Sequence, residues 1–242
     1  MTQTDNLFCL FFAIICIVLI ADSASAQSLS QSNKQLWVDF NPSYYIDKDF
    51  RIFGDVGIRT ELEDNAWRKI VVRPSVGGKL GSIFYYTAGL GSFYTFNQLI
   101  KNRWEIRPFV GTQFTLFPLN IRLKSFIRLE RRYDFNTSTW MSVNSWRLRY
   151  QLTFSHRWGA VSAEDYWQAS LTAEAFFPLS GIEGQFREQF RLSFGLVRSF
   201  DREVNIRFEL TAQQQQLFFD PTENISDIYF RFRVYHNWWQ IN

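Results

Sequence analysis

The sequence predicts an all-β protein, specifically a transmembrane antiparallel up-and-down β-barrel with an even number of strands, ten being favoured and twelve possible. Three observations predict this fold. Most of the chain divides into segments in which apolar and polar residues alternate, and a β-strand sends successive side chains to opposite faces. Several segments reach the roughly 9–11 residues with which a tilted strand crosses a bilayer. An apolar stretch followed by small residues, as in a secretory leader, precedes all of them.

The N-terminal segment has the pattern of a cleavable signal peptide. Residues 7–20 are almost wholly apolar but fall short of the roughly 20 residues of a membrane-spanning helix, and small residues follow up to Ala26. Met1–Asn6 contains no Lys or Arg, so an uncleaved anchor is the alternative to cleavage after Ala26. The predicted organisation is a signal peptide at 1–26, a flexible lead-in at 27–35 and a single β-barrel domain at 36–242.

Composition narrows the class of protein. Cys9 and Cys16, the two cysteines of the chain, lie in the predicted signal peptide, so disulfides do not hold the mature domain together. Aromatic residues make up 19% of the chain, and Trp and Tyr favour membrane–water interfaces. Removing Asp5 and Asp22 with the leader leaves 26 basic and 21 acidic residues, a net charge of +5. This charge is spread over many segments, so we expect no nucleic-acid partner.

Eleven segments have the length or the alternation of a strand. In residues 146–155 an apolar set from Trp146 to Phe154 alternates with a polar set that begins at Arg147, and residues 228–235 alternate in the same way. Charge on the lipid face of a barrel is costly, so the apolar sets are predicted to face lipid and the polar sets the lumen. The predicted strands are 36–46, 50–60, 67–80, 82–96, 103–117, 119–133, 144–156, 166–177, 186–199, 202–216 and 227–238.

The predicted number of spanning strands depends on residues 36–46. Single-chain bacterial barrels normally have an even number of strands. Asn41-Pro42 lies inside 36–46 and proline removes a ladder donor, so this segment is predicted not to span, which gives ten strands. Ten strands also place the N-terminus in the periplasm when long connections face outward and tight turns face inward. Twelve follows if a further strand lies near the terminus. Pro74 and Pro108 predict local irregularity in their strands.

Inward-facing charges carry most of the functional information in the sequence. Guanidinium groups bind carboxylate and phosphate, so the lumen is predicted to hold structural ion pairs or to form a porin-like pore or binding cavity for small anions. A ten-stranded barrel is narrow, which favours a plugged interior over a wide channel. Glu105 and Glu130 are further candidate partners for the arginines. The candidate lumen-lining charges are Arg107, Arg122, Arg128, Arg147, Arg149, Glu174, Arg191, Arg207, Glu209, Arg231 and Arg233.

A membrane lipid hydrolase is the second hypothesis. It would combine His156 or His236 with Ser155 as nucleophile and Glu174 as the orienting carboxylate. Adjacent strand residues face opposite sides, so Ser155 and His156 are not expected to meet, and no glycine elbow surrounds a serine. No recognisable metal-ligand spacing occurs. The sequence therefore predicts no enzyme, no cofactor and no metal site.

Short motifs spread over the chain carry a family resemblance. They are Leu36-Trp37-Val38, the strands around Arg59 and Arg73, Trp146-Arg147-Leu148-Arg149-Tyr150, Ala173-Glu174-Ala175-Phe176-Phe177 and Glu188-Gln189-Phe190-Arg191-Leu192-Ser193-Phe194-Gly195-Leu196. Through these motifs the chain resembles the bacterial outer-membrane barrels of the domain of unknown function 2490 family. The resemblance implies a barrel in the cell outer membrane of a Gram-negative bacterium, with no assigned activity. The implied partners are outer-membrane lipid and, during insertion, the barrel-assembly machinery.

A third hypothesis is a soluble secreted barrel that binds a hydrophobic ligand. In that protein the apolar faces would turn inward and the arginines outward. The oligomeric state and the identity of any ligand are left open.

Overall fold

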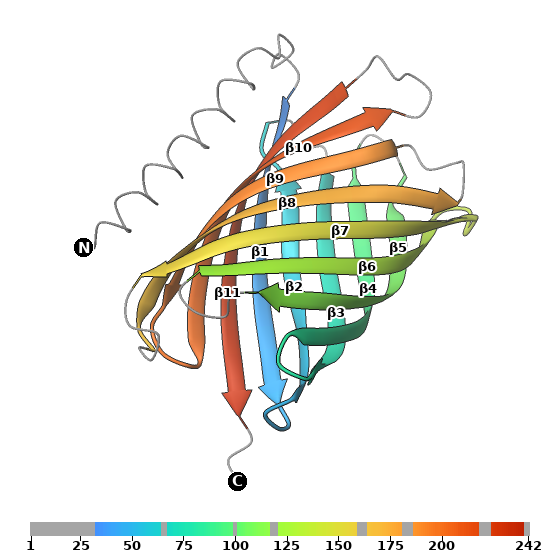
Figure 1. The fold of residues 1–242 in the computed structure, drawn as a ribbon. Helices are drawn as coiled ribbons and strands as arrows, with labels where there is room; N and C mark the ends of the chain where they lie inside the picture. The colour runs from blue at the N-terminus through green and yellow to red at the C-terminus, as the bar shows by residue number, and fades with distance from the viewer. Residues whose placement is uncertain are drawn as a thin grey trace. The chain divides into compact units, whose positions relative to one another are not determined.

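The computed structural model describes residues 32–63, 67–98, 101–116, 121–158, 164–180, 186–217 and 224–239. In these residues the chain forms eleven β-strands that close into a barrel, which confirms the predicted all-β barrel (Figure 1). Within the described ranges no helix has the length and hydrophobicity needed to cross a membrane, a finding that concerns helices alone. The predicted signal peptide and residues 27–31 of the lead-in lie outside the described residues.

Each predicted segment overlaps one observed strand. The barrel begins earlier than predicted, because β1 starts at Ser32 and so includes residues 32–35 of the predicted lead-in. The strands are β1 (Ser32–Tyr45), β2 (Phe50–Glu61), β3 (Trp67–Leu80), β4 (Phe84–Asn97), β5 (Arg103–Leu116), β6 (Ile121–Asn136), β7 (Ser142–Trp158), β8 (Tyr166–Ser180), β9 (Phe186–Ser199), β10 (Val204–Leu217) and β11 (Asn224–Trp239).

The barrel closes through a parallel pair, β1 and β11. All pairs of consecutive strands are antiparallel, so after ten reversals β11 runs in the same direction as β1. Figure 1 shows the arrowheads of both strands at the same end. Trp37 contacts Tyr229 and Asp39 contacts Arg231, so the numbers of both partners rise together, as they do in a parallel pair.

The predicted even strand number, with ten favoured, is corrected by this closure. Eleven strands form the ring in the described part of the chain, and β1 is one of them. An even strand number and the alternation of long and tight connections predict that this strand does not span, and Pro42 supports that prediction. The proline interrupts the pairing of β1 with β2, but Phe40 pairs with Val56 and Ser43 with Phe53, so the register is the same on both sides of it. A single missing donor therefore leaves a gap in one ladder without ending the strand.

Pro74 and Pro108 have the same local effect, as predicted. Pro74 pairs with Gly54 of β2, whereas the β3–β4 pairing is interrupted between Val72 and Ser75. Pro108 pairs with Leu90 of β4 and interrupts the β5–β6 pairing. Each proline turns its donor-free side to one neighbour only, so the barrel accommodates it without a shift in register.

Alternation along the strands separates an apolar outer face from a polar inner face. On β11 Tyr229 is 2% exposed and Phe230 is 47% exposed, and on β10 Thr211 and Leu210 show 1% and 48%. These values confirm the faces predicted for the two strands. Among the described residues, seven buried side chains are hydrophobic and nineteen are polar or charged. This distribution is the reverse of a soluble protein core, where apolar residues dominate.

The two ends of the barrel differ. The turn end is the end that carries the connections 46–49, 81–83 and 200–203. In the first of these turns the Asp47 carboxylate accepts hydrogen bonds from the backbone N–H groups of Asp49 and Phe50, both at 2.7 Å, which lowers the pKa of Asp47. The loop end carries the connections after β2, β4, β6, β8 and β10 together with the start of β1, whereas β11 ends at the turn end (Figure 1).

Candidate functional site: a cationic cavity inside the barrel

The inward-facing side chains surround a cavity of about 1040 Å³. At the loop end it reaches the exposed residues Asn33, Leu179 and Ser180, and toward the turn end it extends to Lys124 and Arg207. Among the described residues, fourteen Lys or Arg side chains line the cavity against five Asp or Glu. Asp39, Asp55 and Glu130 form ion pairs with lining arginines without lining the cavity, which raises the number of carboxylates to eight. The remaining excess of six basic groups gives the lumen a positive potential, which low-dielectric walls concentrate.

The structure places ten of the eleven sequence-predicted charges on this lining. These ten residues come from β5 through β11. The eleventh, Arg122 of β6, is not part of the lining. Arg122 has the inward parity of Lys124 but lies closer to the turn end. The ten lining residues are Arg107, Arg128, Arg147, Arg149, Glu174, Arg191, Arg207, Glu209, Arg231 and Arg233.

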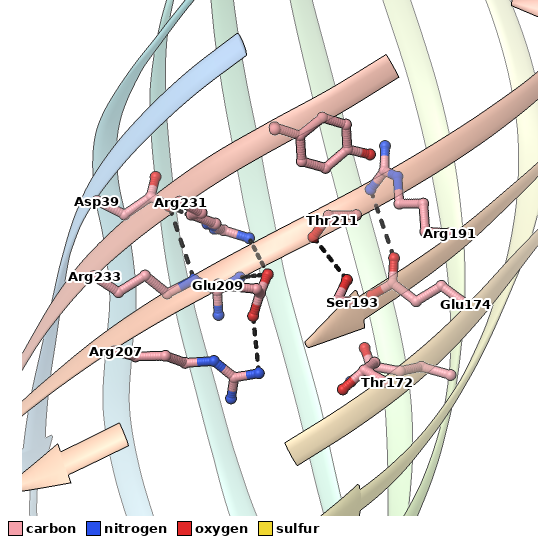
Figure 2. A network of polar contacts seen from close by, with 12 residues as sticks. Asp39, Thr172, Glu174, Arg191, Ser193, Arg207, Glu209, Thr211, Arg231 and Arg233 are labelled. Carbon is pink, nitrogen blue, oxygen red and sulfur yellow. Dashed lines mark hydrogen bonds and ion pairs between the residues drawn. The ribbon is translucent and has the colours of Figure 1, made fainter. Parts of the chain in front are cut away.

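One ion-pair network crosses the seam between β10, β11 and β1. Figure 2 shows Arg207, Arg231 and Arg233 directed toward Glu209, with Asp39 beside them. Arg207 lies 2.8 Å and Arg233 3.5 Å from Glu209, and Arg231 forms an ion pair with Asp39. The Asp39 side chain is fully buried. The two carboxylates therefore hold three guanidinium groups in fixed positions.

Three further carboxylates, on β5, β6 and β8, each hold two arginines. They are the remaining candidate partners from the sequence analysis, and each forms its pairs within its own strand or with neighbouring strands. The pairs are Glu174 with Arg149 and Arg191, Glu130 with Arg128 and Arg147, and Glu105 with Arg107 and Arg132. In every case one carboxylate serves more than one cation, so the wall keeps a positive excess.

Aromatic rings and guanidinium groups pack against one another along part of the inner wall. We call this set the aromatic–arginine belt, and its members are Phe93, Arg59, Trp37, Tyr229, Arg191 and Phe176. Trp37 and Tyr229 stack with ring centroids 4.3 Å apart, which joins β1 to β11. The Arg59 guanidinium lies 3.8 Å above the Trp37 ring. Stacking on aromatic faces holds guanidinium groups without neutralising their charge.

Three of the lining cations have no carboxylate partner within the described residues. Eleven of the fourteen form ion pairs, and the exceptions are Arg59, Lys69 and Lys124. Arg59 and Lys69 lie toward the loop end and Lys124 toward the turn end. Their charges are therefore available to an anion that enters the cavity.

Below the cavity, inward side chains near the turn end hydrogen-bond to one another. Arg51 donates to the hydroxyl groups of Tyr85 at 2.7 Å and of Tyr45 at 3.1 Å. Its guanidinium also lies 4.6 Å from the Phe53 ring. None of these four side chains lines the cavity, and they occupy one side of the lumen, on β1, β2 and β4, nearer to the turn end.

Sequence reasoning missed several members of this site. Arg59, Lys69 and Arg73 line the cavity, and Asp39 supports it, yet none was among the candidates. The signal was present for Asp39, because Leu36, Val38 and Phe40 alternate with Trp37 and Asp39. The prediction that residues 36–46 do not span the membrane leaves Asp39 out of the lumen. The β3 segment alternates less regularly, which concealed Lys69 and Arg73.

The residues considered for a hydrolase do not meet. Ser155 is buried on the inner face, whereas His156 follows it on the opposite face and packs 5.1 Å from the Trp158 ring. His236 lies 4.0 Å from the ring of Trp238. Glu174, the third candidate, is occupied by two arginines. Over the described ranges, no group of three His, Cys, Asp or Glu side chains could hold a metal ion.

The fold and its interior define the chain as a closed β-barrel with a charged lumen. It belongs to the family described as "Protein of unknown function (DUF2490)", whose model matches residues 34–225, and this match confirms the family resemblance. No curated protein matches the chain.

Proposed function

We propose that the chain is an integral outer-membrane β-barrel whose lumen binds small anions. The observation that carries this proposal is the distribution of charge across the wall. The outer face is apolar over the middle of the strands, while fourteen basic side chains line the cavity against five acidic ones. A barrel in lipid requires an apolar outer face, and an anion site requires an excess of basic side chains.

The outer surface supports the membrane location. Large apolar side chains such as Val56, Leu210 and Phe208 are 49%, 48% and 58% exposed near the middle of their strands. A contiguous apolar surface of this extent is unfavourable in water. The outward-facing Arg131 lies toward the loop end of β6, where its guanidinium packs over the rings of Tyr133 and Trp146. This position lets the charge reach the interface while the stem stays in lipid.

Strand length and aromatic residues fit the same location. The strands contain 12 to 17 residues, and a tilted strand needs about 9–11 to cross a bilayer. Trp158, Trp167 and Trp238 are exposed at the turn end. Such residues form the aromatic girdle of membrane barrels because an indole ring keeps its polar edge near water.

A binding cavity is favoured over an open channel. The cavity reaches the loop end, and the hydrogen-bonded side chains of Tyr45, Arg51 and Tyr85 fill part of the lumen nearer to the turn end. The charged lining also gives a hydrophobic ligand little apolar contact, which weighs against the soluble carrier alternative. The separation of Ser155 from His156 weighs against the lipid hydrolase.

A purely structural role for the charges is the second candidate. It is favoured by the eleven lining cations that already pair with carboxylates. In a purely structural role the ion pairs fill the barrel. Added anions would then bind to the lumen no more tightly than they bind to the outer surface.

Three measurements test the proposal, the first on cells that express the full chain and the other two on the refolded chain from residue 27 onward. Membranes washed with alkaline carbonate should retain the protein, and the detergent-folded barrel should migrate differently in gels before and after boiling. Calorimetric titration with inorganic phosphate should show binding that weakens as salt increases. Protein that is soluble without detergent would refute the membrane location, and an absence of phosphate binding would leave the structural role. Steady conductance in planar bilayers would instead show an open channel.

A further inference from the structure

Arg59 and Lys69 are direct neighbours on the inner wall. They are paired positions on the antiparallel strands β2 and β3, and both line the cavity. Like charges at directly opposite positions destabilise a sheet. Among the described residues neither side chain forms an ion pair with a carboxylate. The lining arginines on the neighbouring strands, such as Arg73, Arg103 and Arg107, do form such pairs. Neither cation of this pair therefore has a carboxylate within ion-pairing distance among the described residues, and Asp39 and Glu105 attract them only at longer range.

Stacking holds the Arg59 guanidinium in place. It lies 3.8 Å over the Trp37 ring, which itself stacks on Tyr229, and the Phe93 ring lies 5.8 Å from the same guanidinium. The Arg59 Nε atom is buried and has no hydrogen-bond partner. A guanidinium stacked on a ring keeps its N–H groups in its own plane, where they remain free to donate. Arg59 thus lines the cavity with a guanidinium whose orientation is fixed by stacking, although its Nε atom is itself covered.

Lys69 contributes a second cation beside this edge. Its ammonium lies 5.5 Å from the Trp67 ring, and Thr95 of β4, the paired position on its other side, also lines the cavity. A threonine hydroxyl donates or accepts hydrogen bonds as a ligand requires. The group of Arg59, Lys69 and Thr95 therefore combines a planar fork, a point charge and a hydroxyl on three consecutive strands.

The carboxylates closest to this group are engaged elsewhere. Asp39 pairs with Arg231 and lies 4.0 Å from Arg233, and Glu105 pairs with Arg107 and Arg132. Glu61 lies two positions from Arg59 along β2, but it forms no ion pair with Arg59 and does not line the cavity. An incoming anion would therefore displace no direct ion pair of Arg59 or Lys69 and would compete only with the longer-range attraction of Asp39 and Glu105.

We propose that Arg59 and Lys69 form a binding site for the dianionic phosphate group of a phosphate monoester. This inference rests on the proposed function of the lumen and names its ligand class. The guanidinium fork matches two phosphate oxygens, and the ammonium neutralises the second charge. Trp37, Trp67 and Phe93 flank the group, so the remainder of the ligand meets aromatic surface. The phosphate is carried by a soluble ester or by a lipid, which share this chemistry.

Calorimetric titration of the detergent-folded barrel with inorganic phosphate tests the site. Arg59→Gln should weaken binding by about tenfold or more, the range expected when a hydrogen-bonded charge is removed. Arg59→Lys, which keeps the charge and loses the fork, should fall between the native protein and Arg59→Gln. Lys69→Gln should weaken binding by roughly three- to tenfold. Lys34→Gln is the charge-matched control, because Lys34 is exposed and paired with Glu63, and it should bind as the native protein does. A gel-mobility shift on heating shows that each variant is folded.

The outcomes separate this site from the general function. Native binding that is equal in Arg59→Gln and Lys69→Gln would overturn the site and leave an anion-binding lumen. Losses in Lys124→Gln as large as those in Arg59→Gln would also overturn it, since attraction would then be diffuse. An absence of phosphate binding by the native barrel would overturn both proposals. Parallel titrations with phenyl phosphate, a soluble ester, and short-chain phosphatidic acid, a lipid, show which source supplies the phosphate group. Binding of either that is tighter than that of inorganic phosphate supports the site.

Discussion

Asp39 of β1 and Arg231 of β11 form an ion pair across the seam where the barrel closes. The two residues are separated by 192 positions in the chain, and the carboxylate is fully buried. Glu209 extends the contact, because Arg233 and Arg207 also pair with it (Figure 2). The closure of an odd-numbered barrel therefore depends on side chains that also shape the wall of the lumen.

Replacement of Asp39 should weaken the seam. Asp39→Asn leaves Arg231, in a buried position, with only the more distant Glu209 at 4.0 Å as counter-ion, and breaking a buried pair costs up to about 3–5 kcal/mol. Urea unfolding of the barrel in detergent or lipid measures this loss. The exposed pair Lys34–Glu63 is the control, because Lys34→Gln should change the stability by no more than about 1 kcal/mol. Equal effects of the two substitutions would show that the seam does not depend on Asp39.

Gly57 should tolerate no side chain. It is paired with Asp39, and a Cβ atom at this position would lie 2.1 Å from the Asp39 carboxylate and 2.6 Å from the Val38 carbonyl oxygen. Gly57→Ala should therefore destabilise the barrel by about 1–3 kcal/mol, as overpacking does. The same unfolding experiment measures it, with Val56→Ala on the outer face for comparison. A Gly57→Ala barrel as stable as the native one would show that Asp39 has room to move away.

The parallel seam fixes which residues share an end of the barrel. The start of β1 lies at the loop end, so Asn33→Cys and Ser138→Cys should react alike with a membrane-impermeant maleimide on intact cells. Lys48→Cys lies at the turn end. If the two loop-end cysteines are labelled on intact cells, Lys48→Cys should be labelled only after the cells are broken, and if they are protected, it should be labelled on intact cells. Since Cys9 and Cys16 lie in the predicted leader, the mature chain supplies a cysteine-free background. Asn33→Cys grouping with Lys48→Cys would indicate an even-numbered barrel instead.

A charge on the outer face should be costly only in a membrane. Leu210 is the seventh residue of β10 and is 48% exposed. Leu210→Arg should reduce the stability of the lipid-inserted barrel by about 2–4 kcal/mol, the cost of arginine near the bilayer midplane. Leu210→Phe, which keeps an apolar side chain, should have a much smaller effect. A Leu210→Arg protein that is unchanged in stability would contradict a lipid-facing surface.

Strand positions and faces could be predicted because both are local properties. Alternation in 204–213 or 228–235 needs no knowledge of neighbouring strands, and Tyr229 and Phe230 fall on the predicted sides. The strand number could not be obtained in this way, since it depends on which strands meet at the seam. Pro42 suggested a break, but the contacts of Trp37 and Asp39 with β11 keep β1 in the ring.

The pairing of the charges was likewise beyond local reasoning. Alternation places Arg231 and Glu209 inside, but it does not show that Asp39 is the partner of Arg231. Nor does it distinguish Arg59, which stacks on Trp37, from arginines that meet a carboxylate. These differences arise from register between strands, and they decide which cations remain available to a ligand.

Diffraction from crystals soaked in tungstate, an electron-rich analogue of phosphate, tests the central claim most directly. We predict an anomalous peak in the lumen within hydrogen-bonding distance of the Arg59 guanidinium and the Lys69 ammonium, and its loss in Arg59→Gln crystals. A native lumen without any anomalous peak, in crystals whose outer surface binds tungstate, would contradict the account.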